Sequence, residues 1–116
     1  MYKLLIIIEP QEDWAAFENG WPGFLAAAEK MPGLRREVSS RVDKVLHGIY
    51  HAALVHELYF DDLEAARQAM ASEEGQLSGQ ILQTLTGGKL TLLFADHLED
   101  ELKNIQQFAG SDDENT

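Results

Sequence analysis

Apolar residues recur along this chain with two different periods, and the order of the periods predicts strands and helices in turn. Residues 2–9 form a short, isoleucine-rich run that Pro10 ends, as expected of a buried strand. Beyond Asp13, a residue type that caps helices, apolar side chains return at spacings of three and four, the pattern of a helix with one face against a core. This stripe comprises Trp14, Phe17, Trp21, Phe24, Leu25 and Ala28. Because Pro22 lies inside the stripe and proline removes a backbone donor, we expect a kink or break near Trp21.

A second strand is predicted over residues 34–45, and alternation assigns its side chains to two faces. One face carries Leu34, Arg36, Val38, Ser40 and Val42, and the other carries Arg35, Glu37, Ser39 and Arg41. The second face is wholly polar, which indicates an edge strand with one side toward water.

Two further strands are predicted over residues 50–60 and 89–95, so the order is βαββαβ. This order predicts an α+β, ferredoxin-like fold, with helices on one face of a four-stranded antiparallel sheet. Residues 2–9 are apolar on both sides and residues 50–60 nearly so, whereas sheets with one wet face alternate more cleanly. The sheet therefore has a second apolar face that needs a partner, and we expect a homodimer.

Helical signals fill the interval between the last two strands. Asp61 or Asp62 is expected to cap a helix that runs to about Met70, and Ser72 to begin a further helix to about Leu85. A short C-terminal helix is then predicted from Leu98, Leu102, Ile105 and Phe108. We assign residues 1–108 to one domain and residues 109–116 to an acidic tail that we expect to be disordered.

Two segments carry a family resemblance, MPGLRR at residues 31–36 and YFDDLEAARQAMASEEGQ at residues 59–76. With these segments the chain resembles the EthD-like proteins of the dimeric α+β barrel superfamily. The resemblance covers roughly residues 1–96 and implies two sheets paired face to face in a homodimer. The superfamily includes small cofactor-free monooxygenases, lactone isomerases and haem-binding relatives, so the resemblance also implies a small hydrophobic ligand.

The composition and charge of the chain argue against several classes of function. The net charge of −11 and the lack of a basic cluster free of acids argue against nucleic-acid binding. The chain has no cysteine, which excludes thiolate chemistry, and its first apolar run of five residues is too short for a signal or membrane helix. We expect a cytoplasmic protein without membrane contact. The four histidines do not have metal-ligand spacing on one face, and neither a metal nor a cofactor is expected.

His56 is the candidate catalytic residue. It shares a side of its strand with Leu54, Leu58 and Phe60, and that side is predicted to lie under the helices. Burial there would favour the neutral ring, which can accept a proton. The competing interpretation is a core histidine bonded to a neighbouring carbonyl. The ligand pocket is predicted to contain Trp21, Phe24, Tyr50 and His56.

Two other positions bear on the hypothesis that His56 is catalytic. Glu57 would lie on the opposite side of the sheet from His56 and needs a bonded companion, for which Arg41, Arg35 and Lys3 are candidates. Many EthD-like chains carry a histidine in the first helix shortly before a proline, and Gly20 aligns with it here.

Two function hypotheses follow. One is an oxidoreductase-like, monooxygenase-like or isomerase-like enzyme, or an accessory protein to such an enzyme, that acts on a hydrophobic, ring-containing molecule. The alternative is a non-catalytic homodimer that binds a small molecule or is associated with stress. The missing histidine favours the alternative.

Overall fold

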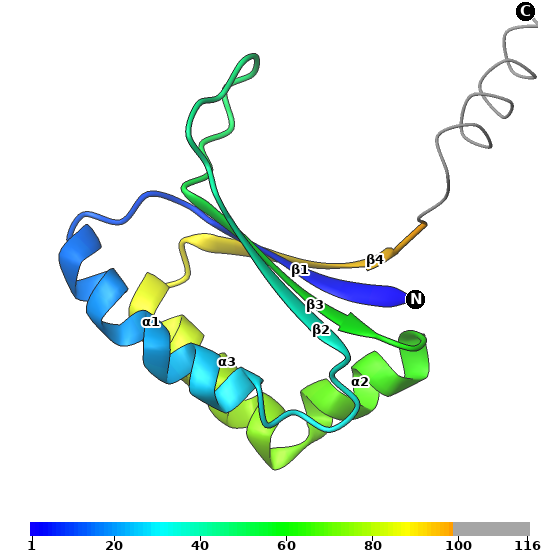
Figure 1. Ribbon diagram of the computed structural model, residues 1–116. Coiled ribbons are helices and arrows are strands. Elements are labelled where there is room, and N and C mark those ends of the chain that lie inside the picture. Colours follow the sequence, from blue (N-terminus) through cyan, green and yellow to red (C-terminus); the bar gives the residue numbers. More distant parts are fainter. Residues whose placement is uncertain (99–116) are drawn as a thin grey trace, which may run out of the picture.

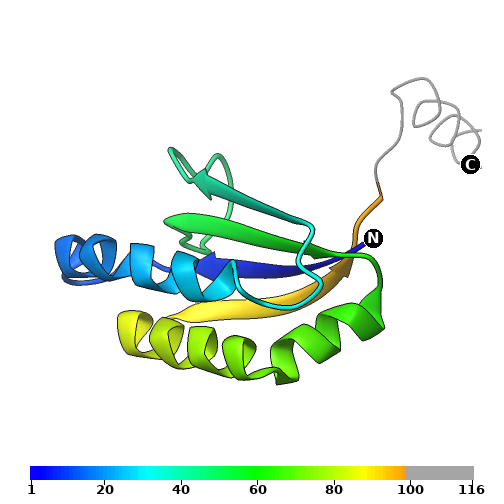
Figure 2. The same ribbon diagram turned by 60° about the horizontal axis from the view of Figure 1, so that its bottom comes forward.

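The computed structural model describes residues 1–98, which form one antiparallel sheet with helices on one side (Figures 1 and 2). The elements are β1 (Tyr2–Ile8), α1 (Trp14–Ala28), β2 (Arg36–Arg41), β3 (Leu54–Phe60), α2 (Leu63–Ala71), α3 (Glu73–Thr86) and β4 (Leu90–Asp96). The strand order is β2-β3-β1-β4, and every neighbouring pair is antiparallel. This arrangement confirms the predicted ferredoxin-like fold and places β2 at a sheet edge. The predicted C-terminal helix and the tail at residues 109–116 lie outside the described residues.

The second and third predicted strands are shorter than expected, because residues 42–53 form a connection and not regular strand. Pairing of β2 with β3 ends at Arg41 and Leu54, and Leu54 also pairs with Ile8, the last residue of β1. The Val42 N–H still donates to the Ala53 carbonyl oxygen at 2.9 Å and the Ala53 N–H to the Ile8 carbonyl oxygen at 2.7 Å, and β1 ends shortly before Pro10, which has no N–H to donate. Residues 42–53 form a long connection that projects past the end of the sheet (Figure 1).

Helix α1 is continuous from Trp14 to Ala28, so the break that Pro22 predicted does not occur. The Asp13 side chain accepts a hydrogen bond from the Ala16 N–H at 3.1 Å, as predicted for the cap. Pro22 removes one donor from the helix interior, but the aromatic stripe packed on the sheet holds the helix on both sides of it.

The junction of α2 and α3 depends on Ser72 and Gly75. Ser72 Oγ donates to the Ala69 carbonyl oxygen at 2.5 Å and accepts from the Gly75 N–H at 3.0 Å, so one side chain serves the end of α2 and the start of α3. A Cβ on Gly75 would lie 2.1 Å from the Ala69 carbonyl oxygen. Only glycine therefore allows the two helices to join at this angle.

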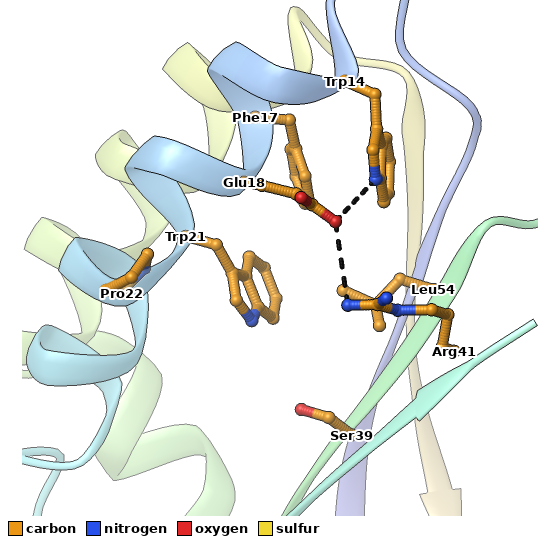
Figure 3. A pocket seen from close by; sticks show the side chains of 8 residues that line it. All are labelled: Trp14, Phe17, Glu18, Trp21, Pro22, Ser39, Arg41 and Leu54. Atoms are coloured by element: carbon orange, nitrogen blue, oxygen red, sulfur yellow. Dashed lines mark hydrogen bonds and ion pairs between the residues drawn. The ribbon is translucent and has the colours of Figure 1, made fainter.

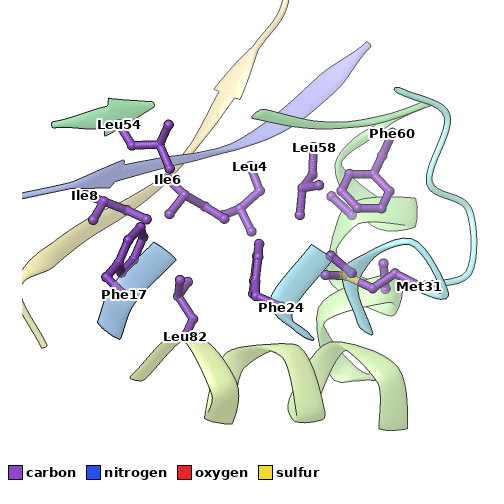
Figure 4. Close-up of a cluster of buried hydrophobic side chains, with 13 residues drawn as sticks. Leu4, Ile6, Ile8, Phe17, Phe24, Met31, Leu54, Leu58, Phe60 and Leu82 are labelled. Atoms are coloured by element: carbon purple, nitrogen blue, oxygen red, sulfur yellow. The ribbon is translucent and has the colours of Figure 1, made fainter. Parts of the chain in front are cut away.

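The core lies between the helices and the inward side of the sheet (Figure 4). Ile6 and Leu58 are fully buried on the two central strands, and Phe24 of α1 packs among them. The other labelled members of this cluster are Leu4, Ile8, Phe17, Met31, Leu54, Phe60 and Leu82.

Within residues 1–98, the helices lie on one side of the sheet and the outward side carries none (Figure 2). It presents Leu5, Ile7, Val55, Tyr59 and Leu93 together with an ion pair between Lys3 Nζ and Glu57 Oε1 at 2.6 Å. Lys3 is thus the companion that Glu57 was predicted to need. We call this surface the open face.

None of the helices within residues 1–98 has the length and apolar character that a membrane span requires.

Candidate ligand cavity

A cavity of about 470 Å³ lies between α1 and the β2 edge of the sheet (Figure 3). Helix α1 supplies one wall and strands β2 and β3 supply the other. The lining residues are Trp14, Phe17, Glu18, Trp21, Pro22, Ser39, Arg41 and Leu54. A space of this size accommodates a molecule of two or three fused rings.

The helical wall is a continuous stack of aromatic rings. Ring centroids lie 4.6 Å apart for Trp14 and Phe17, 5.3 Å for Phe17 and Trp21, and 4.8 Å for Trp21 and Phe24. The spacing of three and four residues places all four rings on the same side of α1. Phe24 is buried, whereas Trp21 is only partly buried and faces the cavity. The wall therefore offers flat, polarisable surface to a ring-shaped ligand.

The opposite wall is polar because of the register between β2 and β3. Ser39 pairs with His56 and Glu37 with Leu58, so the side of β2 that holds Glu37, Ser39 and Arg41 faces the helices. The sequence indicated that this polar side would meet water at an edge strand. The edge position is confirmed, and the polar side lines the cavity under α1.

His56 is fully buried beneath Ser39 and has a partner at each ring nitrogen. Nδ1 lies 2.7 Å from Ser39 Oγ, and Nε2 lies 2.7 Å from Glu37 Oε1. The ring meets Trp21 edge-on at a centroid distance of 5.2 Å and Phe24 at 5.8 Å. The competing interpretation of a core histidine agrees with this full burial, but the partners of the ring are the Ser39 and Glu37 side chains and not a carbonyl.

Burial lowers the pKa of His56 below the ordinary value of 6.5, against the opposing effects of Glu37 and Glu57. The neutral ring therefore dominates at neutral pH. The Glu37 carboxylate only accepts hydrogen bonds, so Nε2 carries the ring proton and donates it. Nδ1 then has a free lone pair and accepts a hydrogen bond from the Ser39 hydroxyl.

The mouth of the cavity is spanned by Glu18 and Arg41. Glu18 Oε1 accepts a hydrogen bond from Trp14 Nε1 at 2.8 Å and lies 3.6 Å from an Arg41 guanidinium nitrogen (Figure 3). Both charged side chains are exposed, so the contact is weak and leaves the entrance able to open.

The structure brings three of the four predicted pocket residues together. Trp21 lines the cavity, and His56 and Phe24 contact its ring from behind. Tyr50 lies apart from them, and its hydroxyl is 2.9 Å from Thr91 Oγ1 of β4, on the open face of the sheet. The sequence prediction did not include Ser39 and Glu37, although the alternation that pairs them on one side of β2 was visible.

Gly20 does not face this cavity. A Cβ built on it would lie 2.2 Å from Leu85 Cδ2 of α3, so the position faces the contact between the two helices. A histidine at position 20 would require Leu85 to move and would not reach His56 from this direction. The cavity of this chain is therefore formed without the first-helix histidine that many EthD-like chains carry.

Among residues 1–98, no cluster of three or more histidine, cysteine or acidic side chains could hold a metal ion. The chemistry that the described site offers consists of hydrogen bonding, proton transfer and aromatic contact.

Comparison with known proteins places the chain in a family. No family model matches it. It is 32% identical to an ethyl tert-butyl ether D (EthD) family protein from Bacillus halodurans C-125, and the match has a TM-score of 0.78 and covers 84% of this chain and 99% of that chain. This chain belongs to the EthD family. Among curated proteins, an uncharacterized 11.0 kDa protein in the thcB–thcC intergenic region of Rhodococcus erythropolis is 28% identical over 97 residues, 83% of this chain and 94% of that protein.

More distant structures share the fold of this EthD family chain. A dimeric, ferredoxin-like protein of unknown function from Bacteroides fragilis NCTC 9343 is 13% identical, with a TM-score of 0.61 over 83% of this chain and 95% of that chain. SnoaB, a cofactor-independent oxygenase from Streptomyces nogalater, is 16% identical, with a TM-score of 0.62 over 87% of this chain and 95% of that chain. At these identities the likeness concerns the fold alone.

Proposed function

We propose that this protein is a homodimer in which the cavity between α1 and β2 binds a hydrophobic, ring-containing small molecule. The observation that carries the proposal is the composition of the cavity, with stacked aromatic rings on one wall, the Ser39 hydroxyl beneath them, and Glu18 and Arg41 at the mouth. Small-molecule sites are typically apolar clefts with a few convergent polar groups. Membership of the EthD family agrees with a ligand of this kind.

We further propose that the site can act as a base, with His56 as the proton acceptor. A ligand proton would pass to Ser39 Oγ as the Ser39 hydroxyl proton passes to His56 Nδ1. The ligand would be left as an anion bonded to the Ser39 hydroxyl, and the imidazolium would be held between Ser39 and Glu37. No atom is gained or lost, and no oxidant or metal is needed for this step. Deprotonation of this kind can begin an isomerisation or a cofactor-independent oxygenation, the activity named for SnoaB.

The dimeric part of the proposal rests on the open face. Leu5, Ile7, Val55 and Leu93 are only half-buried or exposed in one chain, and the Lys3–Glu57 ion pair lies among them. A second copy of the same face would remove this apolar surface from water. The dimeric ferredoxin-like protein from Bacteroides fragilis has the same fold.

Titration with 2-naphthol, an aromatic probe of two rings, tests the binding proposal. The wild type is expected to bind one molecule per chain, and Trp21→Ala is expected to weaken binding at least about tenfold because the aromatic wall loses its central ring. Leu82→Ala is the control, since it removes a large apolar side chain of the core, from α3, that does not line the cavity. Equal binding by the wild type and Trp21→Ala would place the ligand site elsewhere.

Solvent exchange separates the enzyme from the binding-only alternative. An enolisable ring ketone such as 2-tetralone, incubated in deuterium oxide with the protein, should exchange its acidic C–H faster than in buffer. His56→Gln should abolish the acceleration while the fold persists, because glutamine matches the shape of the side chain but cannot take a proton at neutral pH. Binding of 2-tetralone without accelerated exchange would support the non-catalytic alternative.

A further inference from the structure

Ser39 is the polar group on the cavity floor through which the buried network reaches a ligand. Among the described residues that line the cavity, the other charged or hydroxyl-bearing side chains are Glu18 and Arg41, which face each other at the mouth. Ser39 is exposed on its cavity side, whereas His56 beneath it is fully buried. A ligand therefore meets the serine hydroxyl and not the imidazole.

The direction of the hydrogen bonds in the network determines what this hydroxyl can accept. His56 Nε2 donates its proton in a hydrogen bond to Glu37, and the Ser39 hydroxyl donates its proton in a hydrogen bond to His56 Nδ1. The serine oxygen then presents only lone pairs to the cavity. It can accept a hydrogen bond from a ligand and has no proton to donate unless the whole network reverses.

We infer that the cavity selects ring compounds with a hydroxyl donor, such as phenols and enols, over the corresponding ethers, and that Ser39 makes the selection. Partly buried Glu37 and fully buried His56 act through Ser39 as positioning residues, since they hold its proton away from the ligand. This inference rests on the proposed function, because it specifies the ligand of the same cavity. The ether oxygen and Ser39 Oγ are both acceptors in this arrangement, so an ether in the same position would leave both of them without a hydrogen-bond donor. An unpaired buried acceptor costs binding free energy.

A matched ligand pair tests the inference. Binding of 2-naphthol and 2-methoxynaphthalene is measured by calorimetry for the wild type, Ser39→Ala and Ser40→Ala. Ser40 is the neighbouring serine of β2, and its register with Val55 places it on the open face, so its variant makes the same chemical change away from the cavity. We expect the wild type and Ser40→Ala to prefer the naphthol by roughly tenfold and Ser39→Ala to bind the two compounds alike.

Glu37→Gln tests whether Glu37 positions the Ser39 proton, again through the ratio of the affinities for 2-naphthol and 2-methoxynaphthalene. Glutamine can donate to Nε2, which allows Nδ1 to carry the ring proton and frees the Ser39 proton to face the ligand. The preference for the naphthol should fall toward one, while affinity for the ether stays the same or rises. A purely structural role for Glu37 would lower both affinities together and leave the ratio unchanged.

The outcomes distinguish this inference from the proposed function. If the wild type binds both compounds equally and Ser39→Ala changes neither affinity, the inference is wrong and the ring-binding cavity still stands. If the wild type binds neither compound, the cavity proposal and this inference fall together. A loss of preference in Ser40→Ala as large as in Ser39→Ala would also contradict the assignment.

Discussion

At the scale of single residues, His56 has no exposed nitrogen and communicates with the cavity through Ser39. Its environment combines full burial with a carboxylate partner, two influences that shift a histidine pKa in opposite directions. Burial has the larger effect, so the ring is neutral at neutral pH and has an acceptor nitrogen. This state is what both the proposed base and the proposed hydroxyl selection require.

The lowered pKa of His56 predicts a pH dependence of stability. The unfolded chain takes up a proton on this residue near pH 6.5, whereas the folded chain takes it up only at a lower pH. The unfolded state therefore binds more protons in the interval below about pH 6.5, and the His56 contribution to stability falls as pH falls through that interval. Wild-type melting temperatures should drop more steeply from pH 7 to pH 5.5 than those of His56→Gln. If melting temperature falls with pH in parallel for the two proteins, the pKa of His56 is the same in the folded and the unfolded state.

At the scale of elements, the short polar side chains at helix ends set where α2 and α3 begin. The sequence left Asp61 and Asp62 open as alternative caps, and the structure assigns different roles to them. Asp62 accepts a hydrogen bond from the Ala65 N–H at 2.8 Å. Asp61 pairs with exposed Arg35 at 2.9 Å, and this guanidinium lowers the pKa of the Asp61 carboxyl.

The two neighbouring aspartates make a matched pair for mutation. Asp62→Ala should lower the free energy of unfolding by about 1 kcal/mol, because it leaves an N–H of the first turn of α2 without its acceptor. Asp61→Ala should change the free energy of unfolding much less, since exposed ion pairs contribute little. Chemical denaturation of both variants measures the difference. Equal losses would mean that α2 does not depend on the Asp62 cap.

The elements were predictable because each has a local signal, but their contacts were not. Asp13 and Ser72 indicate where helices begin, and the isoleucine run indicates β1, so the order βαββαβ could be predicted from the sequence. The periodicities placed Trp21 on the side of α1 that packs against the core and His56 on the side of β3 that lies under the helices, where the structure has them. The cavity floor depends on which residue of β2 pairs with His56, and register is a nonlocal property that one strand cannot show. Tyr50 was misplaced for a similar reason, since β3 begins at Leu54 and the residue belongs to the projecting connection.

At the scale of the whole molecule, the two faces of the sheet serve different purposes. The inward face builds the core and, at its β2 edge, the cavity. The open face is apolar around one ion pair, and its partner in the proposal is a second copy of the chain. The cavity lies on the helix side, so ligand binding and dimer formation can be disrupted separately.

A charge on the open face should separate the chains. Leu93 is 38% exposed on β4 and shares this face with Leu5, so Leu93→Asp is expected to shift the protein from dimer to monomer at micromolar concentration. Leu77→Asp is the control, because Leu77 is 51% exposed on α3, away from the sheet. Light scattering should give twice the 13.0 kDa chain mass for the wild type and Leu77→Asp. A 13.0 kDa particle for the wild type would rule out the dimer.

We propose that the cavity between α1 and β2 holds a ring compound whose hydroxyl donates a hydrogen bond to Ser39. A crystal structure of the protein with 2-naphthol tests it most directly. We expect the naphthalene ring to lie against Trp21, with its hydroxyl oxygen about 2.7 Å from Ser39 Oγ and the Ser39–His56–Glu37 hydrogen bonds intact. A naphthol bound outside this cavity, or bound within it with its hydroxyl turned away from Ser39, would contradict the account.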